Sequence, residues 1–271
     1  MTKIKRMFET KSDGTKEQFY PISHWSAIEG KAEILNPDNS ISLTGLANMQ
    51  RTIDEANRKM QLLFPFYGKS FTALGDSTTY GTAIDGIVYS WLPYVKDPCS
   101  FGQVINKGYS GSRVTKMIGT DKSFVERCSD IMNQSCISIF GGVNDFNYNA
   151  PLGSFTDTVE TTFFGALKKI VLTLSENNSD AKLFFITPMK TNNVHDTFAK
   201  NDLGFTLLDY VNAMKRVADY YSIPVLDLYT HSNISPYIPS QKAKYMNDGT
   251  HLKDIGQQRI ATQIAAFINQ L

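Results

Sequence analysis

Short apolar runs alternate with longer amphipathic segments from residue 69 onward. The apolar runs predict strands at Ser70–Leu74, Gln103–Ile105, Cys136–Phe140, Lys182–Thr187 and Pro224–Leu228. The amphipathic segments predict helices at Gly86–Lys96, Val114–Gly119, Ser123–Met132, Asp157–Glu176, Thr206–Tyr221 and Ile255–Leu271. Nearly continuous apolar strands separated by amphipathic helices are typical of a parallel sheet covered on both faces. We therefore predict an α/β domain over residues 69–271, with five parallel strands in a flavodoxin-like, doubly wound order.

The first 68 residues follow a different pattern and are predicted to form an N-terminal arm. Residues 1–40 are mostly polar, with turn signals such as Asp13-Gly14. A helix is then predicted by an apolar stripe that steps by three and four residues. The stripe consists of Leu46, Met49, Ile53, Ala56, Met60 and Leu63. It fits an amphipathic helix packed on its own domain, or a short coiled coil through residues 46–63 that joins copies of the chain into a homo-oligomer, with a trimer as the working hypothesis.

Composition and charge narrow the classes of function. The chain has 42% hydrophobic residues and a net charge of +1, without runs of like charge. Nothing in this balance favours binding to nucleic acid or to an anionic membrane. No apolar stretch approaches the length of a membrane span, and residues 1–19 lack the apolar core of a signal peptide, so we expect synthesis in the cytoplasm.

Cysteine and histidine usage gives no reason to expect a cofactor. The three cysteines are odd in number and form no CxxC pair, and the four histidines form no HExxH motif. We predict neither a disulfide framework nor a metal site.

Polar clusters lie where the first three predicted strands end, which is the edge at which open α/β sheets bind ligands. The first strand runs into Gly75-Asp76-Ser77, where a serine on a tight turn exposes its hydroxyl group and backbone N–H. Residues Asn106–Arg113 follow the second strand and contain two glycines, and Asn144 follows the third. An amide there can donate to a developing oxyanion. Taken singly, each cluster is equally compatible with ordinary turn chemistry or a helix cap.

A fourth cluster, Asn247–Leu252, precedes the C-terminal helix. Asp248 stands three residues before His251. A carboxylate at that spacing can bind one ring nitrogen and leave the other as a base. His231, after the fifth strand, is the alternative base, but it has no aspartate at that spacing.

Together the four clusters resemble the conserved blocks of the SGNH/GDSL hydrolase family over residues 69–271. GDS resembles the first block, NKGYSG the second, GGVND the third and DGTH the last. The resemblance implies a carboxylic ester hydrolase. It assigns catalysis to Ser77, Asp248 and His251, and an oxyanion hole to Ser77, Gly111 and Asn144. Thr78 stands where the family often has leucine, and no GxSxG elbow of the α/β-hydrolases is present.

The sequence indicates the substrate less closely than it indicates the reaction. Candidate contacts are Asp76, Tyr80, Tyr109, Arg113, Phe146 and Tyr148. Residues 190–204, which include His195, are expected to cover the site. Polar neighbouring loops favour a short acyl group, chiefly acetyl, on a small ester or an acylated glycan. The alternative is a lipase or thioesterase that acts on lipid-like acyl chains.

The N-terminal arm suggests a setting for this activity. The segment TKEQFYPISHWSAIEG resembles openings of tail-associated proteins of phages and prophages. It predicts a virion-associated esterase that acts on host surface polysaccharide. The rival is a structural tail protein that retains a vestigial hydrolase fold, which the complete set of five catalytic and oxyanion residues disfavours.

Overall fold

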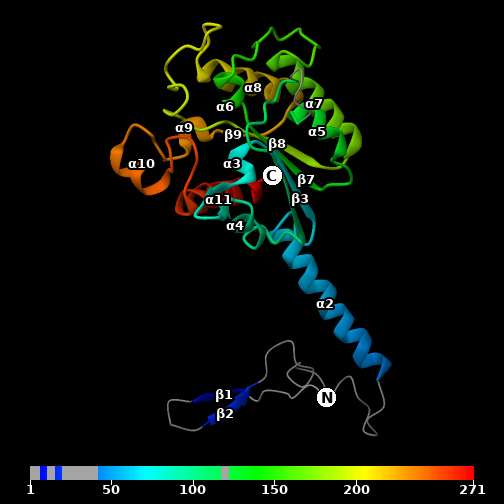
Figure 1. The fold of residues 1–271 in the computed structure, drawn as a ribbon. Helices are drawn as coiled ribbons and strands as arrows, with labels where there is room; N and C mark the ends of the chain where they lie inside the picture. Colours follow the sequence, from blue (N-terminus) through cyan, green and yellow to red (C-terminus); the bar gives the residue numbers. More distant parts are fainter. Residues whose placement is uncertain (1–6, 11–15, 20–41, 117–121) are drawn as a thin grey trace. The chain divides into compact units, whose positions relative to one another are not determined.

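The computed structural model describes residues 7–10, 16–19, 42–116 and 122–271. The chain divides at Leu63 into two compact units, which are treated separately below (Figure 1).

The larger unit contains the predicted five-stranded parallel sheet. Its strands are β3 (Ser70–Gly75), β6 (Gln103–Gly108), β7 (Cys136–Phe140), β8 (Lys182–Ile186) and β9 (Val225–Leu226). They are arranged in the order β6-β3-β7-β8-β9, and every neighbouring pair is parallel. This order places the first strand of the sheet between the second and the third, as in a flavodoxin-like fold. The fold predicted from the sequence is confirmed.

Helices cover both faces of this sheet (Figure 1). One face packs on α5 (Phe124–Arg127), α7 (Phe163–Asn177) and α8 (Leu207–Tyr221), and the other on α4 (Pro93–Lys96) and α11 (Asp254–Ile268). Side chains of a strand alternate between faces, so Ile137 and Ile139 join the first core while Cys136 and Phe140 join the second. Because both faces are buried, the central strands β3 and β7 are largely apolar, whereas the edge strand β6 is more polar and partly exposed.

Local start signals explain where two of these helices begin. At α5, Ser123 and Glu126 form a reciprocal capping box, and Thr206 and Asp209 do the same at α8. Helix α8 ends at Ser222, which has a φ of 55°. These caps fix the helix starts within a residue of the predicted ones, and α8 also ends as predicted. Helix α5 ends at Arg127, well before the predicted end at Met132, and the chain continues there as a 3-10 helix over Cys128–Asp130.

The predicted helix at Gly86–Lys96 is wrong over its first half. That segment belongs to an antiparallel hairpin of β4 (Thr82–Ile84) and β5 (Ile87–Tyr89), and only α4 is helical. Asp85 and Gly86 have φ values of 51° and 79°, the left-handed backbone of a tight two-residue turn. Asp-Gly favours that turn strongly, which outweighs the helical spacing of the apolar residues.

The predicted helix at Val114–Gly119 is also absent over its described part. The backbone N–H groups of Val114 and Thr115 donate to the carboxylate of Asp145 at 2.8 and 3.0 Å. Residues 114–116 therefore serve as a binding loop for a buried charge, and 117–119 lie outside the described residues.

Several short elements complete the larger unit. They are α3 (Ser77–Tyr80), the 3-10 helix η2 (Cys128–Asp130), α6 (Val143–Asn147), α9 (Leu228–His231) and α10 (Pro239–Tyr245). Each is too short to leave a periodic signal in the sequence. Two of them, α3 and α6, begin within three residues of a strand end and carry candidate site residues.

The smaller unit contains a hairpin of β1 (Met7–Thr10) and β2 (Lys16–Phe19) and the helix α2 (Leu43–Leu63). The helix predicted from the apolar stripe is confirmed. Its stripe is largely accessible: Ile53 is 42% exposed and Leu63 is 69% exposed. Most of the segment that suggests a phage-tail origin falls in residues 20–41, outside the described residues, so that hypothesis stays a prediction.

Candidate active site

Ser77 is the first residue of α3, directly beyond the carboxyl end of β3. Asp76 caps this helix, because its side chain accepts the N–H of Thr78 at 2.9 Å. Gly75 must lack a side chain, since a Cβ there would lie 2.1 Å from Oγ1 of Thr79. The strand therefore turns tightly into the helix and presents the serine at the edge of the sheet.

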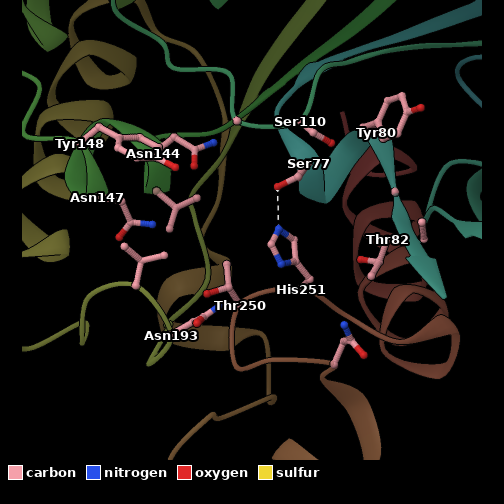
Figure 2. Close-up of a pocket in the computed structure, with 16 residues that line it drawn as sticks. Ser77, Tyr80, Thr82, Ser110, Asn144, Asn147, Tyr148, Asn193, Thr250 and His251 are labelled. Atoms are coloured by element: carbon pink, nitrogen blue, oxygen red, sulfur yellow. Dashed lines mark hydrogen bonds between the residues drawn. The ribbon is translucent and has the colours of Figure 1, made fainter.

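His251 lies between Ser77 and Asp248. Its Nε2 is 3.0 Å from Ser77 Oγ, and its Nδ1 is 2.7 Å from Asp248 Oδ2 (Figure 2). The other oxygen of Asp248 accepts the N–H groups of Thr250 and His251 at 2.9 and 2.8 Å. Partial burial alone would raise the pKa of Asp248, but the hydrogen bonds from His251 and Thr250 outweigh it and hold that pKa below its usual value. Asp248 is therefore a carboxylate that orients the ring.

Gly111 and Asn144 lie on the loops that follow β6 and β7. Within the sheet, Gly75 is in register with Gly108 and Phe140, so these loops meet beside Ser77. Gly111 has a φ of 75°. The Asn144 side chain is 8% exposed, and its Nδ2 donates to the carbonyl of Ser112 at 2.9 Å. An amide nitrogen carries two hydrogens, so the second N–H is available to a ligand.

A buried carboxyl group, Asp145, and a partly buried guanidinium group, Arg127, support these loops. Asp145 accepts the backbone N–H groups of Val114 and Thr115 and also the Thr115 hydroxyl, and burial raises its pKa. Arg127 donates to the carbonyl of Gly75 at 3.0 Å, to Ser112 Oγ at 2.9 Å and to the carbonyl of Lys107.

Arg127 thereby fastens the ends of two neighbouring strands and the Gly111 loop to one another. Burial lowers the pKa of Arg127 to about 10, and the guanidinium group remains charged at neutral pH. Burial also raises the pKa of the nearby Asp76 to about 6, against the opposing effect of the Thr78 N–H.

Ser77 and His251 open into a pocket of about 460 Å³. Its walls are mostly neutral and polar, with residues that include Tyr80, Thr82, Asn147, Tyr148 and Asn193 (Figure 2). Among the described residues that line it, none is a lysine, arginine, aspartate or glutamate. Its aliphatic lining residues are Ala83, Val143 and Val194. The pocket therefore suits a neutral, polar molecule.

Of the remaining candidate contacts, some line the pocket and others do not. Tyr80 and Tyr148 line the pocket and are 46% and 55% exposed. Asp76 and Phe146 do not, because Asp76 is buried under α3 and Phe146 has no exposed surface in the core. The ammonium nitrogen of Lys122 lies 4.6 Å from the centre of the Tyr109 ring. Arg113 donates to the carbonyl of Tyr148 at 3.1 Å and braces the pocket wall from behind.

Neither of the two other described histidines is hydrogen-bonded to Ser77. His231 is exposed at the end of α9, and His195 donates from Nε2 to the carbonyl of Asn147 at 3.1 Å.

Thr82 is a pocket residue to which sequence reasoning assigned no role. Asn147, Asn193 and Asn247 lie in polar segments that were expected near the site, but none of them was named as a substrate contact.

Further ligand sites were sought among the described residues. No group of three or more histidine, cysteine, aspartate or glutamate side chains there is placed to hold a metal ion. Over the same part of the chain, no helix combines the length and the apolar character that crossing a membrane requires.

Comparison with known proteins places this geometry in context. A model of the GDSL-like lipase/acylhydrolase family matches residues 73–259. One crystal structure is 36% identical, with a TM-score of 0.73 over 76% of this chain and 98% of the other. A protein from Lactobacillus plantarum is 27% identical, with a TM-score of 0.68 over 75% of this chain and 98% of its own.

More distant structures share the fold. A lipase/acylhydrolase from Enterococcus faecalis is 19% identical, with a TM-score of 0.53 over 74% of this chain and 96% of its own. A search of curated proteins returned no match.

Proposed function

The chain belongs to the GDSL-like lipase/acylhydrolase family and is an ester hydrolase, and on that premise we propose that it is a serine esterase with Ser77 as its nucleophile. The observation that carries the proposal is the unbroken hydrogen-bond chain from Ser77 Oγ through His251 to Asp248, at 3.0 and 2.7 Å. These distances lie within the reach that a nucleophile and its base require.

In the first step His251 Nε2 takes the proton of the Ser77 hydroxyl as Oγ attacks the ester carbonyl carbon. The ring becomes positively charged and is stabilised by the carboxylate of Asp248. His251 then returns the proton to the departing alcohol, and the acyl group stays on Ser77. In the second step His251 deprotonates a water molecule, which attacks the acyl-serine and releases the acid.

The negative charge that develops on the carbonyl oxygen needs donors on the other side of Ser77. We assign this role to the backbone N–H groups of Ser77 and Gly111 and to the second N–H of Asn144. Asn144 is already fixed by its bond to Ser112, so it needs little reorganisation during the reaction.

We assign the enzyme a preference for short acyl groups, chiefly acetyl, carried by a small polar alcohol or a glycan. Support comes from the pocket, whose walls are rich in amide and hydroxyl groups and poor in aliphatic ones. A long acyl chain would have to place its methylene groups against these polar atoms, which is unfavourable. The lipase or thioesterase alternative requires an apolar channel that the described pocket walls do not provide.

We also assign α2 a role in assembly. The exposed side chains of Ile53, Leu62 and Leu63 would be buried if copies of the chain paired along this helix, and that burial is favourable. Such an arm would present several esterase units together.

The decisive experiment measures hydrolysis of aryl esters of increasing acyl length by the wild type and by Ser77→Ala. We expect acetate to be cleaved fastest and Ser77→Ala to abolish turnover, because no other residue in the pocket is placed to accept the acyl group. The variant should keep the wild-type melting temperature, since the serine hydroxyl faces the pocket.

Two results would contradict the proposal in separate ways. Turnover by Ser77→Ala near the wild-type rate would remove Ser77 as the nucleophile. Faster cleavage of an eight-carbon ester than of acetate would leave the mechanism standing and favour the lipase alternative.

A further inference from the structure

Two walls of the pocket hold side-chain atoms that no described residue satisfies. Asn147, at the end of α6, is 7% exposed, and its Oδ1 is buried without a hydrogen-bond partner among the described residues. Thr82, at the start of β4, is also 7% exposed, and its Oγ1 is likewise unpartnered. Both residues line the pocket of Ser77 and His251. Figure 2 shows them on opposite sides of the His251 ring, with the Asn147 amide nitrogen turned into the pocket.

The polar groups around the Asn147 side chain have hydrogen-bond partners, unlike the Asn147 amide oxygen. Along the same helix, Asn144 donates to Ser112, and the carbonyl of Phe146 accepts from Asn201 Nδ2 at 3.1 Å. The backbone carbonyl of Asn147 itself accepts from His195 at 3.1 Å. Buried polar groups without partners are rare in folded proteins because they destabilise the fold. A side chain left unpaired on a well-bonded backbone is therefore suited to a ligand.

These contacts also fix the position of Asn147. Its backbone is held by the helix on one side and by His195 on the other, so the side chain has few alternative directions. A binding group that is held in place before the ligand arrives loses little entropy on binding. The arrangement is that of a preorganised contact rather than of a mobile surface residue.

The chemistry of the two walls selects the kind of ligand. An amide offers two N–H donors and a carbonyl acceptor, and a hydroxyl can both donate and accept. Neighbouring hydroxyl groups of a polyol or sugar match such a set, because each also donates and accepts. A charged ligand is disfavoured, since no lysine, arginine, aspartate or glutamate is among the described lining residues.

We propose that Asn147, with Thr82 opposite, forms a hydroxyl-binding subsite that recognises the alcohol part of the ester. Preferred substrates would then carry their acyl group on a polyhydroxylated, sugar-like alcohol. This inference rests on the proposed serine-esterase function and identifies the residues that select its substrate.

The test compares two acetates of matched shape. Methyl 6-O-acetylglucoside and cyclohexylmethyl acetate both join the acetyl group to a six-membered ring through one methylene, and only the first carries ring hydroxyls. The measured quantity is the ratio of their kcat/KM values, sugar ester over cyclohexyl ester. We expect the wild type to favour the sugar ester, and Asn147→Leu to lower the ratio by about ten- to a hundredfold, because sites built to bond hydroxyls discriminate strongly. Thr82→Val should lower it by a smaller factor.

A matched control separates this role from a structural one. Asn177→Leu makes the same substitution at the end of α7, at the opposite edge of the sheet from Ser77, and should leave the ratio unchanged. Asn147→Leu has a similar shape and removes an unpaired buried amide, so its melting temperature should equal or exceed that of the wild type.

Three outcomes are decisive. A ratio unchanged in Asn147→Leu overturns the subsite. A lower melting temperature of Asn147→Leu, together with equal losses of kcat/KM on both acetates, also overturns it, because Asn147 would then be a structural residue. If the wild type cleaves neither these acetates nor the aryl esters, the proposed function fails instead, and the two failures are distinguishable.

Discussion

The two parts of the proposed catalytic machinery are anchored in different ways. We call Ser77, Gly111 and Asn144 the serine side, and Asp248 and His251 the histidine side. On the serine side, Ser77 and Asn144 are 9% and 8% exposed, and the contacts that hold them join segments that are distant in the sequence. On the histidine side, the side chains of His251 and Asp248 are 32% and 34% exposed.

The histidine side depends mainly on bonds within its own loop. Asp248 accepts two backbone N–H groups from residues just beyond it, and the N–H of Asn247 donates to the carbonyl of His251 at 2.8 Å. The serine side instead depends on Arg127 and Asp145, which join segments that are distant in the sequence.

This difference matches what each side must do. A nucleophile and its oxyanion donors must fit a transition state closely, and small displacements reduce the rate strongly. A base needs its ring in hydrogen-bond reach and in the right tautomer, which a local loop can provide. Substitution of Asn144, whose side chain holds a neighbouring loop, should therefore disturb both rate and stability, whereas substitutions on the histidine side should affect mainly the rate.

The largest expected effect is on the histidine side. His251→Ala should lower kcat on an aryl acetate by about 10⁴-fold or more, and Asp248→Asn by less, since the aspartate orients the base and does not carry the proton. Thermal unfolding should shift little in either variant, because both side chains are partly exposed. His231→Ala is the control and should retain wild-type kcat. If it proved as damaging as His251→Ala, the assignment of the base would be wrong.

A smaller loss is expected on the serine side. Asn144→Ala should lower kcat by about 10²–10³-fold with little change in KM, because the lost bond forms only with the oxyanion. It should also lower the melting temperature, since the carbonyl of Ser112 loses its donor. Parallel kinetics and calorimetry measure both effects. An unchanged kcat would reduce Asn144 to a structural contact, and an unchanged melting temperature would remove the contrast between the two sides.

Asp76 provides a test that depends on pH. Its pKa is raised to about 6 in the fold from an ordinary value of 3.8, so the folded chain holds a proton that the unfolded chain has released. Stability should therefore fall as pH rises from about 4 to 6, by about 3 kcal/mol from this group. Asp76→Asn cannot ionise and should lack this part of the decline.

Chemical denaturation of both proteins at pH 4, 5, 6 and 7 measures the difference. If the free energy of unfolding depended on pH in the same way for both proteins, Asp76 would be ionised in the fold at no free-energy penalty.

The smallest effect on the site is expected from α2. We expect the full chain to be an oligomer, with a trimer as the working hypothesis, and Ile53→Glu to weaken its association while leaving kcat unchanged. A chain that starts at Lys69 should be an active monomer. Light scattering at micromolar concentration measures size, with Asn57→Glu on the same helix as the control. A monomeric full-length protein would contradict the assembly role.

Sequence patterns were sufficient for the sheet and its long helices. Strands buried on both faces are apolar throughout, so Cys136–Phe140 was predicted with its observed bounds. The family blocks also lead directly to Ser77, Asn144 and His251, because each block ends a strand or precedes a helix. These features depend on the local sequence, so contacts with distant segments do not change them.

Features that depend on contacts between distant segments were not predictable. The carboxyl group of Asp145 binds the N–H groups of Val114 and Thr115, a contact between segments about thirty residues apart that no local pattern reveals. The role of Arg127 is hidden for the same reason, since three of its four acceptors (the Gly75 and Lys107 carbonyls and Ser112 Oγ) are distant in the sequence. The Asp85-Gly86 turn is a different case, because its signal is local and visible in the sequence. The helix prediction followed the apolar spacing, whereas in the structure the turn decides.

The separation of the two sides along the chain has a consequence for biosynthesis. Ser77 and His251 are 174 residues apart. At about 5–20 residues per second, ribosomes need on the order of ten to thirty seconds to make the chain between them. Throughout that time the nucleophile has been synthesised but has no base. The nascent chain cannot hydrolyse esters in its surroundings until His251 and the following helix have left the ribosome and folded against the sheet, and the appearance of esterase activity marks the completion of folding.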